Sequence, residues 1–261
     1  MADVLAPHYA RCPKCGHAPL PEDQALPAEC SACGLILAKY GTLLPHPPEI
    51  SSTREWLASW LFHVPDTVGK ADWIARAATL GVFSLWTLWI WSDVDIRGGA
   101  SGSNFLHAIL LPFHEAGHYL VFRWFGQFIM TLGGTLGQHL MPIVLGSALL
   151  IQKRDGFGAA IFFWLLGFST IDMAVYMYDA FDPKLMLLGG TTGAESDWHD
   201  WQNTFGDLGL LRRARGIGLV FGGLGMAMML AALAWAARVL WLQKARVGDS
   251  LSPEWDVKDL R

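Results

Sequence analysis

The chain has 261 residues, of which 52% are hydrophobic and only 16% charged, and it contains 13 tryptophans. This composition is too apolar for an ordinary soluble domain and predicts a multi-pass membrane protein with a small soluble part. The net charge is -4 and the basic residues form no long run, which argues against nucleic acid as a partner. The first 20 residues contain no apolar segment like that of a secretory signal, so we expect a cytosolic N-terminus.

All four cysteines lie near the start, as the pairs Cys12/Cys15 and Cys30/Cys33, with fourteen residues between the pairs. Each pair can bring two thiolates to one tetrahedral ion. We therefore predict a zinc ribbon over residues 1–45 that holds one structural Zn²⁺. Two disulfides or redox pairs are the alternative, which a reducing cytosol disfavours. The charges of the ribbon form no basic face, so we expect it to contact a cytosolic protein or to act as a regulatory cap.

The rest of the chain predicts an all-α membrane domain with about four to five transmembrane helices. Residues 46–72 should form a Pro-rich linker and an interfacial helix, residues 73–242 the membrane-embedded domain, and residues 243–261 a polar tail. Residues 126–151 are either one short span or a re-entrant loop followed by a span. The clear candidate spans are 73–91, 105–125, 157–180 and 217–242.

The second of these spans contains the sequence His-Glu-Ala-Gly-His, from His114 to His118. On a helix, the i, i+4 spacing places both imidazoles on one face, where they can bind one metal ion. Glu115 would then lie where a general base acts on water at the metal, as in HExxH metallopeptidases. The alternative is a chance match whose histidines only hydrogen-bond within a helix bundle. The cost of ionisable residues in an apolar span disfavours it.

Other histidines could contribute to this site. His107 lies seven residues before His114 on the same helical stripe, and is either an accessory or channel residue or a packed interhelical histidine. His199 and Asp200 lie in a polar connection, residues 181–215, and could also reach the metal. For these two, a place on the surface of a loop is the commoner explanation.

With His-Glu-Ala-Gly-His in a predicted span and carboxylates in a later one, the chain resembles the site-2 protease family of intramembrane zinc metallopeptidases. The resemblance covers residues 105–180. It implies that His114 and His118 are zinc ligands, that Glu115 is the catalytic base, and that an aspartate from a later helix completes the site. The N-terminal segment resembles short bacterial zinc ribbons and is a separate module.

The family's aspartate usually lies in a Leu-Asp-Gly motif, to which Tyr-Asp-Ala around Asp179 is the nearest match, with Asp172 second. These two carboxylates share one helical face, which would be costly in a membrane without a cation or proton. The family's Gly-Pro-x-x-Asn signature is matched only loosely by the stretch from Gly134 to Gln138. The resemblance therefore implies Asp179 or Asp172 as the third ligand and Gly134 and Gln138 as substrate-binding residues.

The implied function is that of a zinc-dependent metalloendopeptidase of the bacterial cytoplasmic membrane. It would hydrolyse peptide bonds of membrane-protein substrates in contact with the lipid bilayer, using one catalytic and one structural Zn²⁺. Three alternatives remain. They are a non-proteolytic metal-binding scaffold or regulator acting through its zinc ribbon, a membrane di-iron oxidase, for which few histidines are present, and a transporter, for which no internal repeat is visible.

Overall fold

A computed structural model of the protein describes residues 9–24, 28–37, 52–196 and 198–248. The chain divides into two compact units, Met1–Trp56 and Leu57–Arg261. The boundary lies inside the segment predicted as linker and interfacial helix, of which the prolines at positions 45, 47 and 48 are outside the described residues. Most of the predicted polar tail, residues 249–261, is also outside them.

The first unit is built around two tight turns that contain the cysteine pairs. The amide of Gly16 donates to the carbonyl oxygen of Cys12, and the amide of Gly34 donates to that of Cys30, each over 2.8 Å. Both glycines have positive φ, 75° and 67°, a backbone conformation that glycine adopts without steric cost. Each turn therefore folds its two thiols toward one side.

The second unit is helical. Four helical stretches of the described chain are long and apolar enough to cross a membrane. They are α3 (Lys70–Asp93), α5 (Gln127–Lys153), α6 (Gly156–Asp179) and the stretch Leu211–Lys244, which contains η3 (Leu211–Arg213) and α8 (Ala214–Lys244). Three of them match predicted spans. The ambiguous segment 126–151 is one continuous helix, despite Pro142 inside it.

The predicted span 105–125 is wrong as a single crossing helix. In its place are α4 (Asn104–Ala116), a π-helical turn η1 (Gly117–Val121) and a 3₁₀ turn η2 (Arg123–Phe125). The α-helical bonding widens after Ala116, where the amide of Phe122 donates to the carbonyl oxygen of Gly117 over 3.0 Å. Gly126, at φ 88°, then turns the chain into α5. The described chain therefore offers four spans rather than five.

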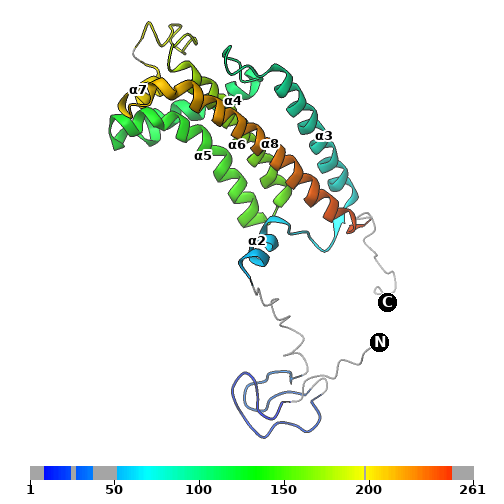
Figure 1. Ribbon diagram of the computed structural model, residues 1–261. Coiled ribbons are helices and arrows are strands. Elements are labelled where there is room, and N and C mark those ends of the chain that lie inside the picture. The colour runs from blue at the N-terminus through cyan, green and yellow to red at the C-terminus, as the bar shows by residue number, and fades with distance from the viewer. Residues whose placement is uncertain (1–8, 25–27, 38–51, 197, 249–261) are drawn as a thin grey trace. The chain divides into compact units, whose positions relative to one another are not determined.

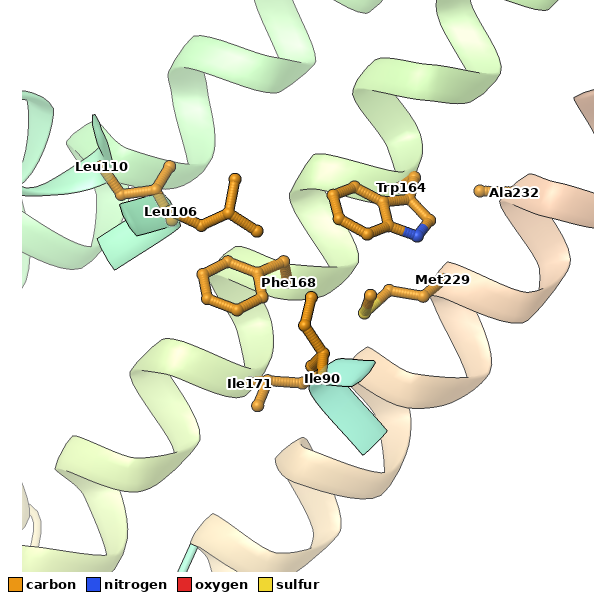
Figure 2. Packing of buried hydrophobic residues seen from close by; sticks show 8 residues of the cluster. All are labelled: Ile90, Leu106, Leu110, Trp164, Phe168, Ile171, Met229 and Ala232. Atoms are coloured by element: carbon orange, nitrogen blue, oxygen red, sulfur yellow. The ribbon is translucent and has the colours of Figure 1, made fainter. Parts of the chain in front are cut away.

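Helix α6 is the centre of the bundle. In its most apolar stretch 61% of the residues are buried, compared with 11–28% in the corresponding stretches of the other three spans. It packs closely on α8. Gly167 makes this possible because it has no Cβ atom; one added there would lie only 2.8 Å from the carbonyl oxygen of Gly225. Trp164 fills the middle of the core, and its indole N–H donates to Thr87 Oγ1 over 2.7 Å. Figure 2 shows this core, made of Ile90, Leu106, Leu110, Trp164, Phe168, Ile171, Met229 and Ala232.

The remaining elements define the two ends of the bundle. They are α2 (Thr53–Leu61), β1 (Val68–Gly69), β2 (Val247–Gly248) and α7 (Asp200–Asp207). Strands β1 and β2 pair in parallel, so the start of α3 and the end of α8 lie at the same end. Helix α7 lies at the opposite end, beside the start of α5 (Figure 1).

Candidate metal centre and its cavity

Three side chains from three elements meet at the α7 end of the bundle. His114 lies in the last turn of α4, His118 in the π-helical turn, and Asp200 begins α7. The Nε2 atoms of the two histidines are 3.1 Å apart, and they lie 3.1 and 3.2 Å from Asp200 Oδ2. Two ligands at about 2.0–2.1 Å from a tetrahedral zinc would be about 3.3–3.4 Å apart. The triangle therefore has nearly the size of one face of a zinc coordination sphere.

The other ring nitrogen of each histidine is held by the protein. His114 Nδ1 lies 2.9 Å from Gln138 Oε1, and His118 Nδ1 lies 2.7 Å from the carbonyl oxygen of Met130. Both partners are acceptors, since the Gln138 amide nitrogen donates to Ser169. Each Nδ1 must then carry the proton, which leaves the lone pair of Nε2 for a metal.

The carboxylate of Asp200 is in the form that a metal requires. Burial alone would raise its pKa, but hydrogen bonds and charge interactions with His114 and His118, which require a proton on an imidazole Nε2 when no metal is bound, outweigh burial and hold the pKa of Asp200 below its ordinary value. Two imidazole nitrogens and a carboxylate oxygen at this separation repel one another unless a positive charge lies among them. A proton on one nitrogen or a divalent cation can supply that charge. The donor set thus fits a zinc ion.

Gly134 has no side chain, and this leaves room for the two imidazoles of the triangle. A Cβ atom at this position would collide with Nε2 of both His114 and His118. The neighbouring Gly133 and Gly137 allow the backbone of α5 to approach that of the metal-binding segment at Gly117. The structure therefore places Gly134 directly against the candidate metal ligands, and its predicted contact with substrate stays a prediction.

We expect Gly134→Ala to weaken metal binding while the helices remain folded. The added methyl group would displace the two imidazoles, and changes around the ligands typically cost about 10–100-fold in metal affinity. Gly223→Ala is the matched control, because a Cβ atom at Gly223 meets nothing within 4 Å. Zinc titration of both variants in detergent checks the expectation. Equal affinities would show that Gly134 does not limit the space at the site.

Glu115 and the metal centre share the wall of one cavity with a volume of about 1010 Å³. The cavity reaches along α4 to His107 and is closed on another side by the loop before α7. Its wall mixes polar groups with apolar ones; among the latter are Leu111, Met130, Met173, Val175 and Leu185–Leu188. Glu115 follows the first histidine directly and lines the same cavity as the ligand triangle.

The two aspartates predicted as third ligands lie elsewhere, each beside its own histidine. Both carboxylate oxygens of Asp172 are 3.0 Å from Nδ1 of His107. Asp179 Oδ2 is 3.3 Å from Nε2 of His199. Each aspartate thus has its own imidazole as the partner that was predicted to be a cation or a proton. The carboxylate that the structure places beside His114 and His118 is that of Asp200, instead of Asp172 or Asp179.

Two further predicted residues have different surroundings from those expected. Gln138, predicted to bind substrate, lines the cavity but is only 4% exposed and bridges His114 to Ser169, so its contact with substrate stays a prediction. His199, for which a loop surface was the commoner explanation, is fully buried. It precedes Asp200, and its Nδ1 accepts from the amide of Gln202, so it caps α7.

The four cysteines of the first unit form a second group that could hold a metal ion. All four Sγ atoms lie within 4.8 Å of one another, and none forms a disulfide. The separations of Cys12 from Cys33 and of Cys15 from Cys30 are 3.7 and 3.8 Å. Thiolates at about 2.3 Å from a tetrahedral zinc would be about 3.8 Å apart. The group therefore has the size of a four-thiolate zinc site.

No protein-family model, curated protein or solved structure matches this chain. The assignment of function therefore depends on the geometry of the site.

Proposed function

We propose that the protein is a zinc-dependent endopeptidase that hydrolyses peptide bonds of membrane-protein substrates, in the manner of the site-2 protease family. The observation that carries the proposal is the triangle of His114, His118 and Asp200, with Glu115 on the wall of the same cavity. This cavity lies in a unit with four helices able to cross a membrane. A purely structural metal site would need neither a neighbouring carboxylate nor a cavity of this size.

Each residue has a distinct role in this proposal. A bound zinc ion would supply Lewis acidity, which polarises a carbonyl group and lowers the pKa of water to about 7. His114, His118 and Asp200 would hold the ion through the three atoms described above. Glu115 would take the proton from the attacking water and pass it to the leaving amine.

The cavity suits a stretch of extended polypeptide. Its volume of about 1010 Å³ is at the upper end of the range of about 300–1,000 Å³ that is typical of small-molecule pockets. A helical substrate segment must unwind before a carbonyl reaches the metal, and its freed backbone groups then need polar partners. Asn104, Thr131 and Thr135 on the cavity wall can provide them. These polar groups support a polypeptide substrate, whereas the volume alone suits a small molecule equally well.

The four-cysteine group fits a structural zinc ion in an N-terminal zinc ribbon, which would contact a cytosolic protein. Free thiols agree with the reducing interior of a bacterial cell and with a cytosolic N-terminus at the cytoplasmic membrane. This separate unit is also the feature that favours the second candidate function, that of a non-proteolytic scaffold or regulator.

Metal removal tests the proposal. Protein purified in detergent should contain zinc, and a chelator should abolish its cleavage of membrane proteins until zinc is restored. The substrate sample is a membrane preparation from cells lacking the protein, and new peptide termini are counted by mass spectrometry. Iron at the histidine site, or cleavage that survives complete metal removal, would contradict the proposal.

A further inference from the structure

A second polar cluster, formed by Asp179 and His199, adjoins the metal centre, because His199 directly precedes Asp200 in the chain. Asp179 ends α6 and His199 precedes α7. His199 is fully buried, and its Nε2 atom lies 3.3 Å from Asp179 Oδ2. A buried carboxylate–histidine contact is retained at a cost in desolvation, so its position directly before Asp200 calls for a reason.

We infer that the pair Asp179–His199 is a positioning device that holds Asp200 against the two imidazoles of the metal centre. The inference rests on the proposed metal site and adds two residues that act on it through Asp200. Neither residue is a ligand.

The tautomer of His199 is fixed by its contacts. Its Nδ1 atom accepts a hydrogen bond from the amide of Gln202 over 3.1 Å and therefore carries no proton. The proton must then lie on Nε2, which donates it to Asp179. One side chain thus caps the start of α7 and ties that start to the end of α6.

Asp179 is itself held in a fixed direction. The backbone amides of Lys184 and Leu185 donate to its Oδ1 and Oδ2 atoms over 2.9 and 3.1 Å. Tyr176 supports the same junction, because its hydroxyl accepts from the amide of Asp200 and its ring lies 4.1 Å from that of His199. The start of α7 is therefore held at three points.

Helix α7 needs such support because it has only eight residues and follows a long connection from α6. Helices this short are not stable by themselves in water, so tertiary contacts must determine where Asp200 points. His114 and His118, in contrast, lie on one continuous segment packed against α5. The position of Asp200 therefore depends on the packing of Trp201 and Phe205 in the core and on the contacts at the start of α7.

The substitution His199→Asn separates the two roles of this residue. Asparagine is among the best N-cap residues, so the cap of α7 is kept. Its shorter side chain cannot span the distance to Asp179. Asp179→Asn weakens the contact from the other side, because an amide oxygen is a poorer acceptor for Nε2–H than a carboxylate is.

Cobalt titration of the full chain in detergent gives the test. The cysteine group adds thiolate charge-transfer absorption that a histidine–aspartate site lacks, so the two sites are read separately. We expect His199→Asn and Asp179→Asn each to weaken binding at the histidine site by about 10–100-fold. The double variant should be little weaker than either single variant, because both act on the same contact. Binding at the cysteines should not change.

Asp182→Asn is the matched control, since Asp182 is an exposed acid near Asp179 whose carboxylate pairs with the Lys184 side chain. It should bind cobalt as the unchanged protein does. Thermal melting of each variant measures folding separately. Full cobalt affinity in His199→Asn would overturn the positioning role and leave the proposed function intact. Absence of cobalt at the histidine site of the unchanged protein would overturn both.

Discussion

Glu115→Gln should abolish peptide-bond cleavage without removing the metal. The amide cannot accept a proton from water, and the loss of a general base typically lowers the rate by about 10²–10⁴-fold. Glu115 does not belong to the triangle of ligand atoms, so zinc content should stay the same. We would measure new termini in membrane proteins and zinc per chain, side by side, for the two proteins.

Glu195→Gln is the matched control, because the Glu195 carboxylate accepts hydrogen bonds from Thr192 and Glu195 is not among the described residues that line the cavity. Its cleavage rate should equal that of the unchanged protein. The comparison also separates the two candidate functions. A membrane protein that accumulates uncut only with Glu115→Gln would be a substrate. If Glu115→Gln cleaved at the normal rate, Glu115 would not be the general base. If neither protein cleaved any membrane protein, the scaffold function would be favoured.

The apolar pattern of the sequence was enough to locate most of the fold. Long hydrophobic runs identified three of the four spans, because a buried or lipid-facing helix needs about twenty apolar residues in succession. The same reasoning was wrong for residues 105–125. That segment is equally apolar, but its helix is interrupted after Ala116 and ends before Gly126. Hydropathy registers side chains and is insensitive to such backbone changes.

The sequence also located two of the three side chains that the structure brings together as candidate metal ligands. The spacing of His114 and His118 is a local property of one helix, so it can be recognised without knowledge of the fold. The third ligand comes from 82 residues further along the chain than His118, and only the tertiary fold brings it near. A weak local signal existed: Asp200 follows a histidine between two tryptophans, inside an otherwise polar connection.

The reasoning that favoured Asp172 and Asp179 was physically sound but incomplete. A carboxylate inside a membrane helix does need a positive partner. In the structure Asp172 has His107 and Asp179 has His199, so neither needs the metal. A single sequence cannot assign partners when several histidines are available.

Asp200→Ala is expected to cause the largest loss of metal from the histidine site. It removes one of three ligand atoms, so affinity should fall by more than the roughly 100-fold upper range for changes around the ligands. The imidazoles of His114 and His118 would then be the two remaining protein ligands of the ion. Zinc titration with a competing chelator measures the loss. Zinc bound by the cysteine group should remain and serves as the internal reference.

Asp172→Asn is the informative comparison, because it tests the ligand that the family resemblance implied. Its carboxylate is fully engaged with Nδ1 of His107 and takes no part in the triangle, so metal affinity should be unchanged. The reverse result, with zinc lost from Asp172→Asn and kept by Asp200→Ala, would mean that α6 supplies the ligand when metal is bound. Because Asp200 begins α7 and Asp172 lies within α6, the two variants decide which of these helices completes the metal site.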